Sequence, residues 1–284
     1  MATKKKRKQG TWWKGGLVVL CSIALTTLVI NASDGLRVPN SSLFAGVGAS
    51  GEIKHCPPGM AYVTRPNGGF CVDRYENSPD KSCFSEHPRA PGDTRMNIAQ
   101  SDCTPVSAEG QIPWTNVTLA ESQVLCARAG KHLPTGAEWY RAAIGTPDEL
   151  NKGCVLGKVG QEEASPAGAQ SSCKSAAGAF DMVGNVWEWT DETARDGMIA
   201  GVKLPSTGYV LEADSDGFPA KTGDTPAYSF GGDHIWTEPD EVRGVFRGGF
   251  WSMNDRAGIF TMNATQPTSF VGIAVGFRCA KEAS

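Results

Sequence analysis

The chain has 284 residues with a formal net charge of −3, and 40% of the residues are hydrophobic. Six of the 27 basic residues lie near the N-terminus, namely Lys4, Lys5, Lys6, Arg7, Lys8 and Lys14, and no acidic residue precedes Asp34. The other 21 basic residues face 30 acidic ones, so the rest of the chain carries a net charge of −9. This acidic balance excludes nucleic acid as a partner of that part.

The N-terminus has the order of an export signal. Its basic run is followed by an apolar run from about Gly16 to Ile30, as in signal sequences. The apolar run is shorter than the ~20 residues that span a bilayer comfortably, yet it suits a short signal anchor. We therefore expect residues 1–32 to be a signal anchor, or a signal peptide cleaved after Ala32. The protein is then at the cell surface, either tethered to the membrane by its N-terminus or secreted.

Residues 33–52 contain Gly, Ser and Pro and are expected to form a linker, and residues 53–284 to form one domain. The 34 glycines and 17 prolines of the chain predict many turns and few helices. Strands are expected at Met60–Thr64, Phe70–Arg74, Val186–Thr190, Val242–Phe246 and Gly276–Ala280. From about 145 to 235 the pattern is irregular and predicts no element.

Two helices have clear start signals. Thr118 and Glu121 form a capping box that opens a helix running through Ala129. Thr135 and Glu138 open a second helix in the same way, with Trp139, Tyr140 and Ala143 on its buried side.

Eight cysteines follow the apolar run, and an even number in an exported protein predicts four disulfides. Eight cysteines permit 105 pairings, so the pairing stays open. Local pairs would close short loops and leave Cys126 with Cys279; the resulting set is Cys56–Cys71, Cys83–Cys103, Cys154–Cys173 and Cys126–Cys279. The four histidines are scattered and show no zinc-ligand spacing.

The segment from Phe180 to Trp189 combines two acidic residues, a turn glycine and two tryptophans. Asp181 and Glu188 offer carboxylate oxygens, and a turn near Gly184 leaves carbonyls free for a hard cation such as calcium. Trp187 and Trp189 lie on one face of a strand and would anchor the loop. The alternative is an aromatic strand whose acidic residues are solvated.

The order of several motifs resembles the formylglycine-generating enzyme family, also called the sulfatase-modifying factor domain. These motifs include Phe70-Cys71-Val72-Asp73-Arg74-Tyr75-Glu76, Leu133-Pro134-Thr135, Gly184-Asn185-Val186-Trp187-Glu188-Trp189, Arg247-Gly248-Gly249 and Gly276-Phe277-Arg278-Cys279. The resemblance implies an α+β fold, a C-type lectin-like fold with two helices, a small twisted antiparallel sheet and long loops. It also implies structural calcium, held by the side chains of Asp181 and Glu188 and the carbonyls of Gly184 and Val186.

The chain departs from this family where the family's copper is bound. Genuine formylglycine-generating enzymes hold copper with two cysteines shortly after the Arg-Gly-Gly motif, because thiolates suit Cu(I). Here residues 250–260 contain no cysteine, and Met253 and Met262 are interpreted as packing residues. The histidine cluster of the related iron-dependent sulfoxide synthases is also missing. We therefore expect no copper and assign no catalytic residue.

The C-terminal segment, residues 248–279, resembles the variable region of proteins diversified by reverse-transcriptase retroelements. In that family a fixed lectin-like scaffold carries changing surface positions that bind a ligand. The resemblance implies ligand-binding roles for Trp251, Ser252, Asn254, Asp255, Arg256, Thr261, Asn263, Thr265, Thr268, Ser269 and Phe270. Most of these side chains are small or polar, which suits an adaptable binding surface on a rigid frame. The alternative is an ordinary surface loop without diversification.

These observations predict an exported, membrane-tethered protein that is not an enzyme and binds a macromolecular surface ligand, a protein or a glycan, through its C-terminal face. The opposing hypothesis is an oxygen-dependent oxidase that converts a cysteine of a sulfatase to formylglycine. The missing cysteine pair favours binding.

Overall fold

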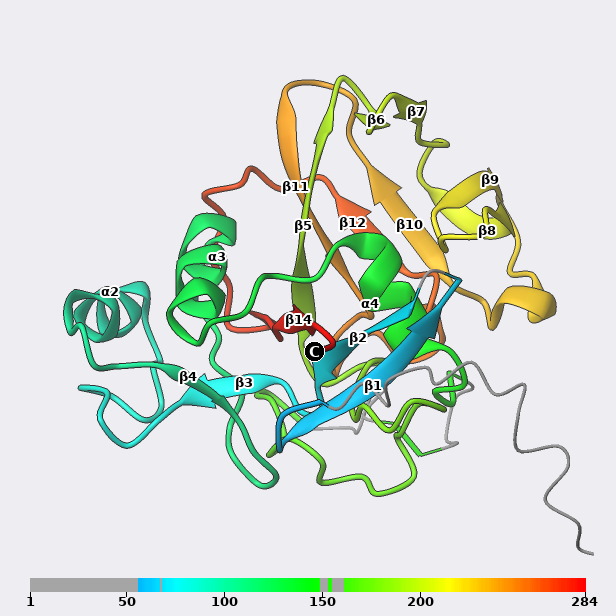
Figure 1. Cartoon of the computed structure of the whole chain (residues 1–284). Helices are drawn as coiled ribbons and strands as arrows, with labels where there is room; N and C mark the ends of the chain where they lie inside the picture. The colour runs from blue at the N-terminus through cyan, green and yellow to red at the C-terminus, as the bar shows by residue number, and fades with distance from the viewer. Residues whose placement is uncertain (1–55, 67, 149–152, 155–160) are drawn as a thin grey trace, which may run out of the picture. The chain divides into compact units, whose positions relative to one another are not determined.

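The computed structural model describes residues 56–66, 68–148, 153–154 and 161–284. Within them the chain forms three α-helices and fourteen strands (Figure 1). The helices are α2 (Pro91–Ala99), α3 (Leu119–Arg128) and α4 (Gly136–Ala143), and two short 3-10 helices are η2 (Tyr228–Phe230) and η3 (Asn254–Arg256). The predicted export signal, linker and membrane anchor lie outside the described residues. Among the described residues, no helix is both long and apolar enough to cross a membrane.

Nine strands form the largest sheet, in the order β7-β6-β5-β11-β12-β10-β8-β9, with β13 paired to β5. These strands are β5 (Trp187–Arg195), β6 (Met198–Ile199), β7 (Val202–Lys203), β8 (Gly208–Ala213), β9 (Pro219–Gly223), β10 (His234–Thr237), β11 (Val242–Arg247), β12 (Met262–Ala264) and β13 (Val275–Gly276). Most neighbours are antiparallel, but β12 runs parallel to β10 and β13 runs parallel to β5.

Two smaller sheets complete the domain. One has the order β1-β2-β14 and the other pairs β3 with β4. Their strands are β1 (Met60–Arg65), β2 (Gly68–Asp73), β3 (Asn77–Pro79), β4 (Pro105–Ser107) and β14 (Ala280–Glu282). Helices α3 and α4 both pack against β5 (Figure 1).

The expectation of an α+β, loop-rich domain is confirmed, but the sheet is larger than the small sheet predicted. The extra strands come largely from the stretch between 145 and 235, where strands such as β6 and β7 have only two residues and carry no readable alternation. The predicted strand Gly276–Ala280 is split in two, because residues 277–279 leave strand geometry between β13 and β14.

The two predicted helices are confirmed with their caps. The hydroxyl oxygens of Thr118 and Thr135 accept the backbone N–H groups of Glu121 and Glu138, which completes both capping boxes. Helix α2 was not predicted. It buries two polar residues, Thr94 and Asn97, so its sequence lacks an apolar stripe.

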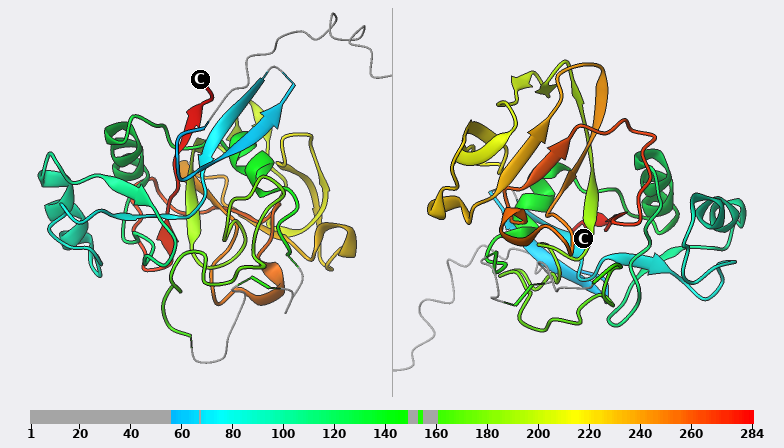
Figure 2. Two further views of the ribbon diagram at one scale, coloured as in Figure 1. Left: turned by 60° about the horizontal axis from the view of Figure 1, so that its bottom comes forward. Right: turned by 180° about the vertical axis from the view of Figure 1, so that it is seen from behind.

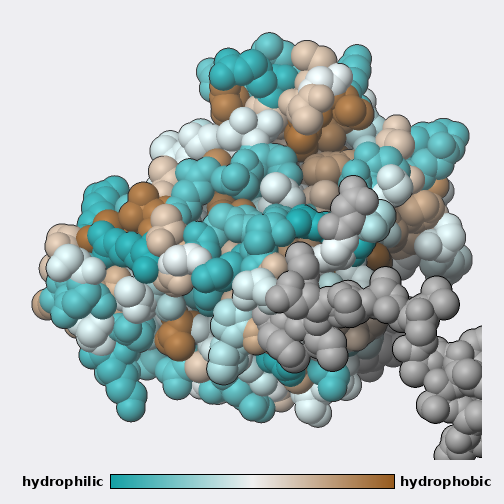
Figure 3. Space-filling view, viewed as in Figure 1, coloured by the Kyte–Doolittle hydropathy of each residue, from teal (hydrophilic) through white to brown (hydrophobic). Residues whose placement is uncertain are grey.

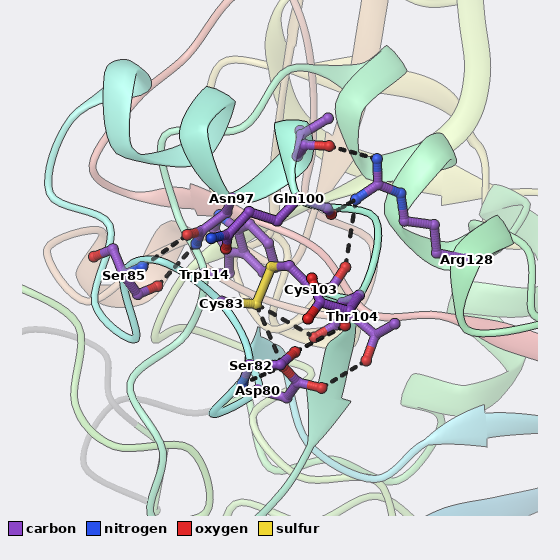
Figure 4. Close-up of a disulfide and its surroundings, with 12 residues drawn as sticks. Asp80, Ser82, Cys83, Ser85, Asn97, Gln100, Cys103, Thr104, Trp114 and Arg128 are labelled. Carbon is purple, nitrogen blue, oxygen red and sulfur yellow. Dashed lines mark hydrogen bonds between the residues drawn. A yellow bond between two sulfur atoms is a disulfide. The ribbon is translucent and has the colours of Figure 1, made fainter.

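Helix α2 belongs to a segment held by side-chain bonds and a disulfide (Figure 4). Cys83 and Cys103 are bonded, and the Arg128 guanidinium of α3 donates to the carbonyls of Gln100, Cys103 and Ile98. The Asn97 amide donates to the Ser85 carbonyl and accepts the Ser85 N–H, both at 2.8 Å. The segment is therefore fixed to the domain although few of its residues are apolar.

All four expected disulfides are present: Cys56–Cys71, Cys83–Cys103, Cys126–Cys279 and Cys154–Cys173. Cys126–Cys279 joins residues 153 positions apart and links α3 to the chain just before β14. Of the four disulfides, this one closes the longest loop and is therefore expected to reduce the conformational entropy of the unfolded chain the most.

A buried ion pair lies beside that disulfide. Arg278 is fully buried, and its guanidinium donates to both carboxylate oxygens of Glu188, with two N–O distances of 2.6 Å. The same guanidinium donates to the carbonyls of Asp73 and Phe180, and the Trp139 indole donates to Glu188 at 2.7 Å. One residue thus connects β2, the loop before β5, β5 itself and, through Glu188, α4.

We predict that Arg278→Met destabilises the domain by about 3–5 kcal/mol, because it leaves a buried carboxylate without its cation. The matched control is Arg243→Met, since Arg243 pairs with the more exposed Glu238 and Glu241 and such pairs contribute less than about 1 kcal/mol. Urea unfolding with the disulfides intact measures both. Equal losses in the two variants would contradict a central role for Arg278.

Candidate functional site

The predicted calcium loop is buried, and its two acidic residues have different partners. Glu188 is 1% exposed, and its oxygens are held by Arg278 and Trp139 as described above. Asp181 is 2% exposed and accepts the backbone N–H of Gly168 at 2.6 Å. The solvated-acid alternative is therefore wrong for both residues. Gly184 and Val186 lie between them, in a turn where Asp181, Gly184 and Asn185 all have positive φ.

A third buried carboxyl group, which the sequence did not single out, faces the same loop. Glu76 accepts the Asn185 amide at 2.7 Å and the Val186 N–H at 3.2 Å. Burial raises the pKa of Glu76 well above its usual range, and the Asp181 and Glu188 carboxylates add to this effect. Burial likewise raises the pKa of Asp181 to about 6. The carboxyl groups of Glu76, Asp181 and Glu188 thus all lie within electrostatic reach of one cation, the Arg278 guanidinium.

This arrangement fits calcium better at Asp181 than at Glu188. Asp181 accepts a neutral donor, whereas both oxygens of Glu188 already bind the charged Arg278. Within the described residues, no group of three or more His, Cys, Asp or Glu side chains is placed to hold a metal ion. Calcium at Asp181, Gly184, Val186 and Glu188 therefore stays a prediction.

The residues after the Arg-Gly-Gly motif provide no thiolate. All eight cysteines in the described part of the chain are in disulfides. Met253 and Met262 are buried, with 7% and 0% exposure, as expected for packing residues.

The predicted ligand-binding residues fall into three groups. Trp251 and Thr261 are buried, at 4% and 0% exposure, so they belong to the frame and not to an accessible surface. Trp251 packs on Val186, and the Thr261 hydroxyl donates to the Arg256 carbonyl at 2.7 Å. The exposed residues are Ser252, Asn254, Asp255, Arg256 and Ser269, and the half-buried ones are Asn263, Thr265, Thr268 and Phe270.

Two of these residues line a hollow of about 300 Å³, which we call the aromatic hollow. Asn263 and Phe270 form part of its wall, together with Trp187, Phe246, Phe250, Gln266 and residues 272–275. The Phe246 and Phe270 rings stack with centroids 6.3 Å apart. Seen from behind, the segment after β12 runs across to α3 (Figure 2), where the Leu119 N–H donates to the Thr268 carbonyl.

An aromatic row connects the hollow to the exposed η3 segment. Trp187 in the hollow contacts Trp236, which contacts His234, with ring centroids 6.1 and 4.2 Å apart. The Arg256 guanidinium lies over the Trp236 ring at 5.7 Å. Burial and the nearby Arg256 lower the pKa of His234, so this imidazole is neutral at pH 7. Arg256 of η3 and the aromatic hollow are therefore linked through Trp236 and Trp187.

Sequence reasoning missed several residues of this surface. Phe250 directly follows the Arg-Gly-Gly motif, so its position was a usable signal. Trp236 lies at the edge of the irregular stretch, and nothing in its neighbourhood indicated the contact with Arg256. The face seen in Figure 3 has its hydrophobic residues dispersed in small groups among hydrophilic ones.

Among known proteins, a curated relative is the hercynine oxygenase of Mycolicibacterium smegmatis. It is 34% identical over 98 residues, which cover 30% of this chain and 23% of that protein. The chain thus spans less than a quarter of that relative's length.

Two solved structures are similar in architecture. The Major Tropism Determinant M1 variant has a TM-score of 0.45 and 15% identity, covering 81% of this chain and 54% of that chain. Treponema denticola variable protein 1 has a TM-score of 0.43 and 14% identity, covering 78% of this chain and 91% of that chain.

The sequence profile of one protein family matches nearly the whole described domain. It is the Sulfatase-modifying factor enzyme 1-like domain, matched at residues 69–283. This match and the α+β architecture confirm the C-type lectin-like fold class that the motifs implied. The chain therefore belongs to the sulfatase-modifying factor enzyme 1-like family.

Proposed function

We propose that this protein is exported and membrane-tethered, and that it binds a macromolecular surface ligand, a protein or a glycan, without catalysis. The binding surface is the C-terminal face, formed by the aromatic hollow and the η3 segment. By analogy with the variable proteins that the chain resembles, this face would be diversified while the frame stays constant.

The observation that carries the proposal is the separation of frame and surface within residues 247–279. Arg247, Trp251, Thr261 and Arg278 are buried and fix the segment, whereas Ser252, Asn254, Asp255 and Arg256 are exposed. Exposed positions on a fixed frame tolerate substitution and can supply an adaptable binding surface. A half-buried aromatic residue, Phe270, and a stacked arginine, Arg256, are residue types found as binding hot spots.

The alternative is an oxidase of a sulfatase cysteine, as the family name and the oxygenase relative suggest. Copper chemistry of that kind needs a thiolate pair to hold Cu(I). Residues 250–260 contain no cysteine, and the cysteines elsewhere in the described domain are oxidised. These observations favour binding over oxidation.

We predict that replacing Arg256 and Phe270 together by Ala weakens ligand capture by roughly 2 kcal/mol or more, because hot-spot residues carry most of the binding energy. The ligand is first selected from a displayed-protein library or a glycan array. The matched control is Arg95→Ala with Tyr62→Ala, two exposed residues on α2 and β1 that line neither the aromatic hollow nor η3. Undiminished binding by the Arg256 and Phe270 variant, with an unchanged melting temperature, would place the ligand elsewhere.

We also predict that the protein does not oxidise a peptide carrying the Cys-x-Pro-x-Arg sulfatase motif. The purified domain is incubated with the peptide, copper, oxygen and a thiol reductant, and the peptide mass is measured. Conversion of the thiol to an aldehyde in proportion to protein concentration would contradict the binding proposal and require a metal site that the motifs do not indicate.

We further propose that calcium binds at Asp181 and the carbonyls of Gly184 and Val186, with Glu188 nearby. Burial raises the pKa of Asp181 from its ordinary value of 3.8 to about 6. In the absence of calcium, the folded protein should therefore lose stability as the pH rises from 3.8 to about 6, because the unfolded state releases this proton more readily. Calcium should stabilise wild type above pH 6 by binding only the folded state. Asp181→Asn, which keeps an oxygen for the Gly168 N–H, should lose the calcium dependence and the part of the pH dependence that comes from Asp181. A melting temperature unchanged by chelator in wild type would remove calcium from the proposal.

A further inference from the structure

A second hollow lies next to the aromatic hollow, and Ile273 lines both. The second hollow has a volume of about 420 Å³, and we call it the charged-rim hollow. Ile273 is 60% exposed and forms the ridge between the two. The backbone around it is fixed, because the carbonyls of Gly272 and Ala274 accept the N–H groups of Asn116 and Trp187.

Apart from Ile273, the lining of the charged-rim hollow lies outside residues 248–279. One wall is residues 87–89, which follow the Ser85 backbone held by Asn97. The Asp93 carboxylate also accepts the Arg89 N–H at 3.0 Å.

A second wall consists of residues 162–164, which precede Ser165. The Asn185 amide accepts the Ser165 N–H at 2.9 Å and donates to its carbonyl at 3.2 Å. Both walls are therefore positioned by a buried asparagine.

The lining of this hollow combines apolar, polar and charged side chains. Pro88, Ile112, Pro113 and Ile273 are apolar, and the buried Thr115 and Asn116 are polar and uncharged. His87 and Arg89 lie on one wall, and Glu162 and Glu163 lie on the other. Arg89 and Glu163 are 3.8 Å apart and exposed, whereas Glu162 makes no ion pair with any residue that the structure describes. One carboxylate at the rim is thus available to a cation.

We propose that the two hollows together bind an extended peptide segment of a protein ligand. An apolar side chain enters each hollow, the peptide backbone crosses Ile273, and a lysine or arginine of the ligand pairs with Glu162. The proposal rests on the proposed function and narrows its ligand to a protein. It also divides the site into two halves. Residues 87–89 and 162–164 lie outside the segment 248–279, in which diversification is proposed, so their half would stay constant, and the other half is built from that segment.

Three observations favour a peptide over a glycan. The charged-rim hollow is lined by no Phe, Tyr or Trp side chain, so it offers a sugar no large aromatic ring to stack on. In an extended peptide every second side chain points to the same side. Two such side chains can enter the two hollows while the backbone between them crosses the ridge at Ile273. The unpaired Glu162 adds charge complementarity toward a basic residue, which steers association.

The test is selection of short random peptides, displayed on phage, against the whole domain. Wild type should enrich peptides that combine apolar residues with a lysine or arginine. A synthetic copy of an enriched peptide should bind Glu162→Lys on the order of 3- to 10-fold more weakly at low salt, as expected for reversal of a rim charge. The matched control, Asp224→Lys, reverses an exposed carboxylate that lines neither hollow and should bind like wild type.

The outcomes separate this inference from the proposed function. If Phe270→Ala abolishes peptide binding while Glu162→Lys leaves it unchanged, the charged-rim hollow is not part of the site, and the inference is overturned while the proposed function stands. Binding on a glycan array without any peptide enrichment overturns the peptide ligand. Failure of Phe270→Ala to weaken an enriched peptide contradicts the C-terminal face itself.

Discussion

The ion pair between Arg278 and Glu188 holds together the parts of the chain on which the rest of the domain depends. It joins the irregular stretch between β13 and β14 to β5, and further bonds from Arg278 reach the end of β2 and the loop before β5. Since a buried ion pair stabilises little beyond its own desolvation cost, its contribution is the fixed geometry that it imposes. The adjacent Cys126–Cys279 disulfide adds a covalent link at the same place.

A second buried arginine fixes the other end of the C-terminal segment. Arg247 donates to the carbonyls of Gly136, Gly217 and Ile259 and lies over the Trp139 ring at 5.2 Å. Burial lowers its pKa to about 10, so it stays charged at neutral pH. The residues between Arg247 and Arg278 are therefore held at both ends, and we expect most substitutions at the exposed positions to leave the fold intact.

Sequence reasoning predicted the parts of the fold that have local signals. Capping boxes at Thr118 and Thr135 located α3 and α4, and short cysteine spacings led to all four disulfides. Strands of two residues and a helix that buries Thr94 and Asn97 have no such signal. For the site, residue type indicated Phe270 and Arg256, but Trp251 and Thr261 were misplaced on the surface because burial depends on contacts with distant residues. The neighbours Trp236 and Ile273 were missed for the same reason.

The most direct test of a constant frame carrying a binding face is saturation mutagenesis of the displayed domain, with resistance to protease as the measure of folding. Ser252, Asp255 and Arg256 should accept nearly every amino acid, and Asn254 should favour Gly, Asn and Asp because its φ is positive. Arg247, Trp251 and Arg278 should accept very few. Exposed positions as restrictive as the buried ones, or buried positions equally tolerant, would contradict the account.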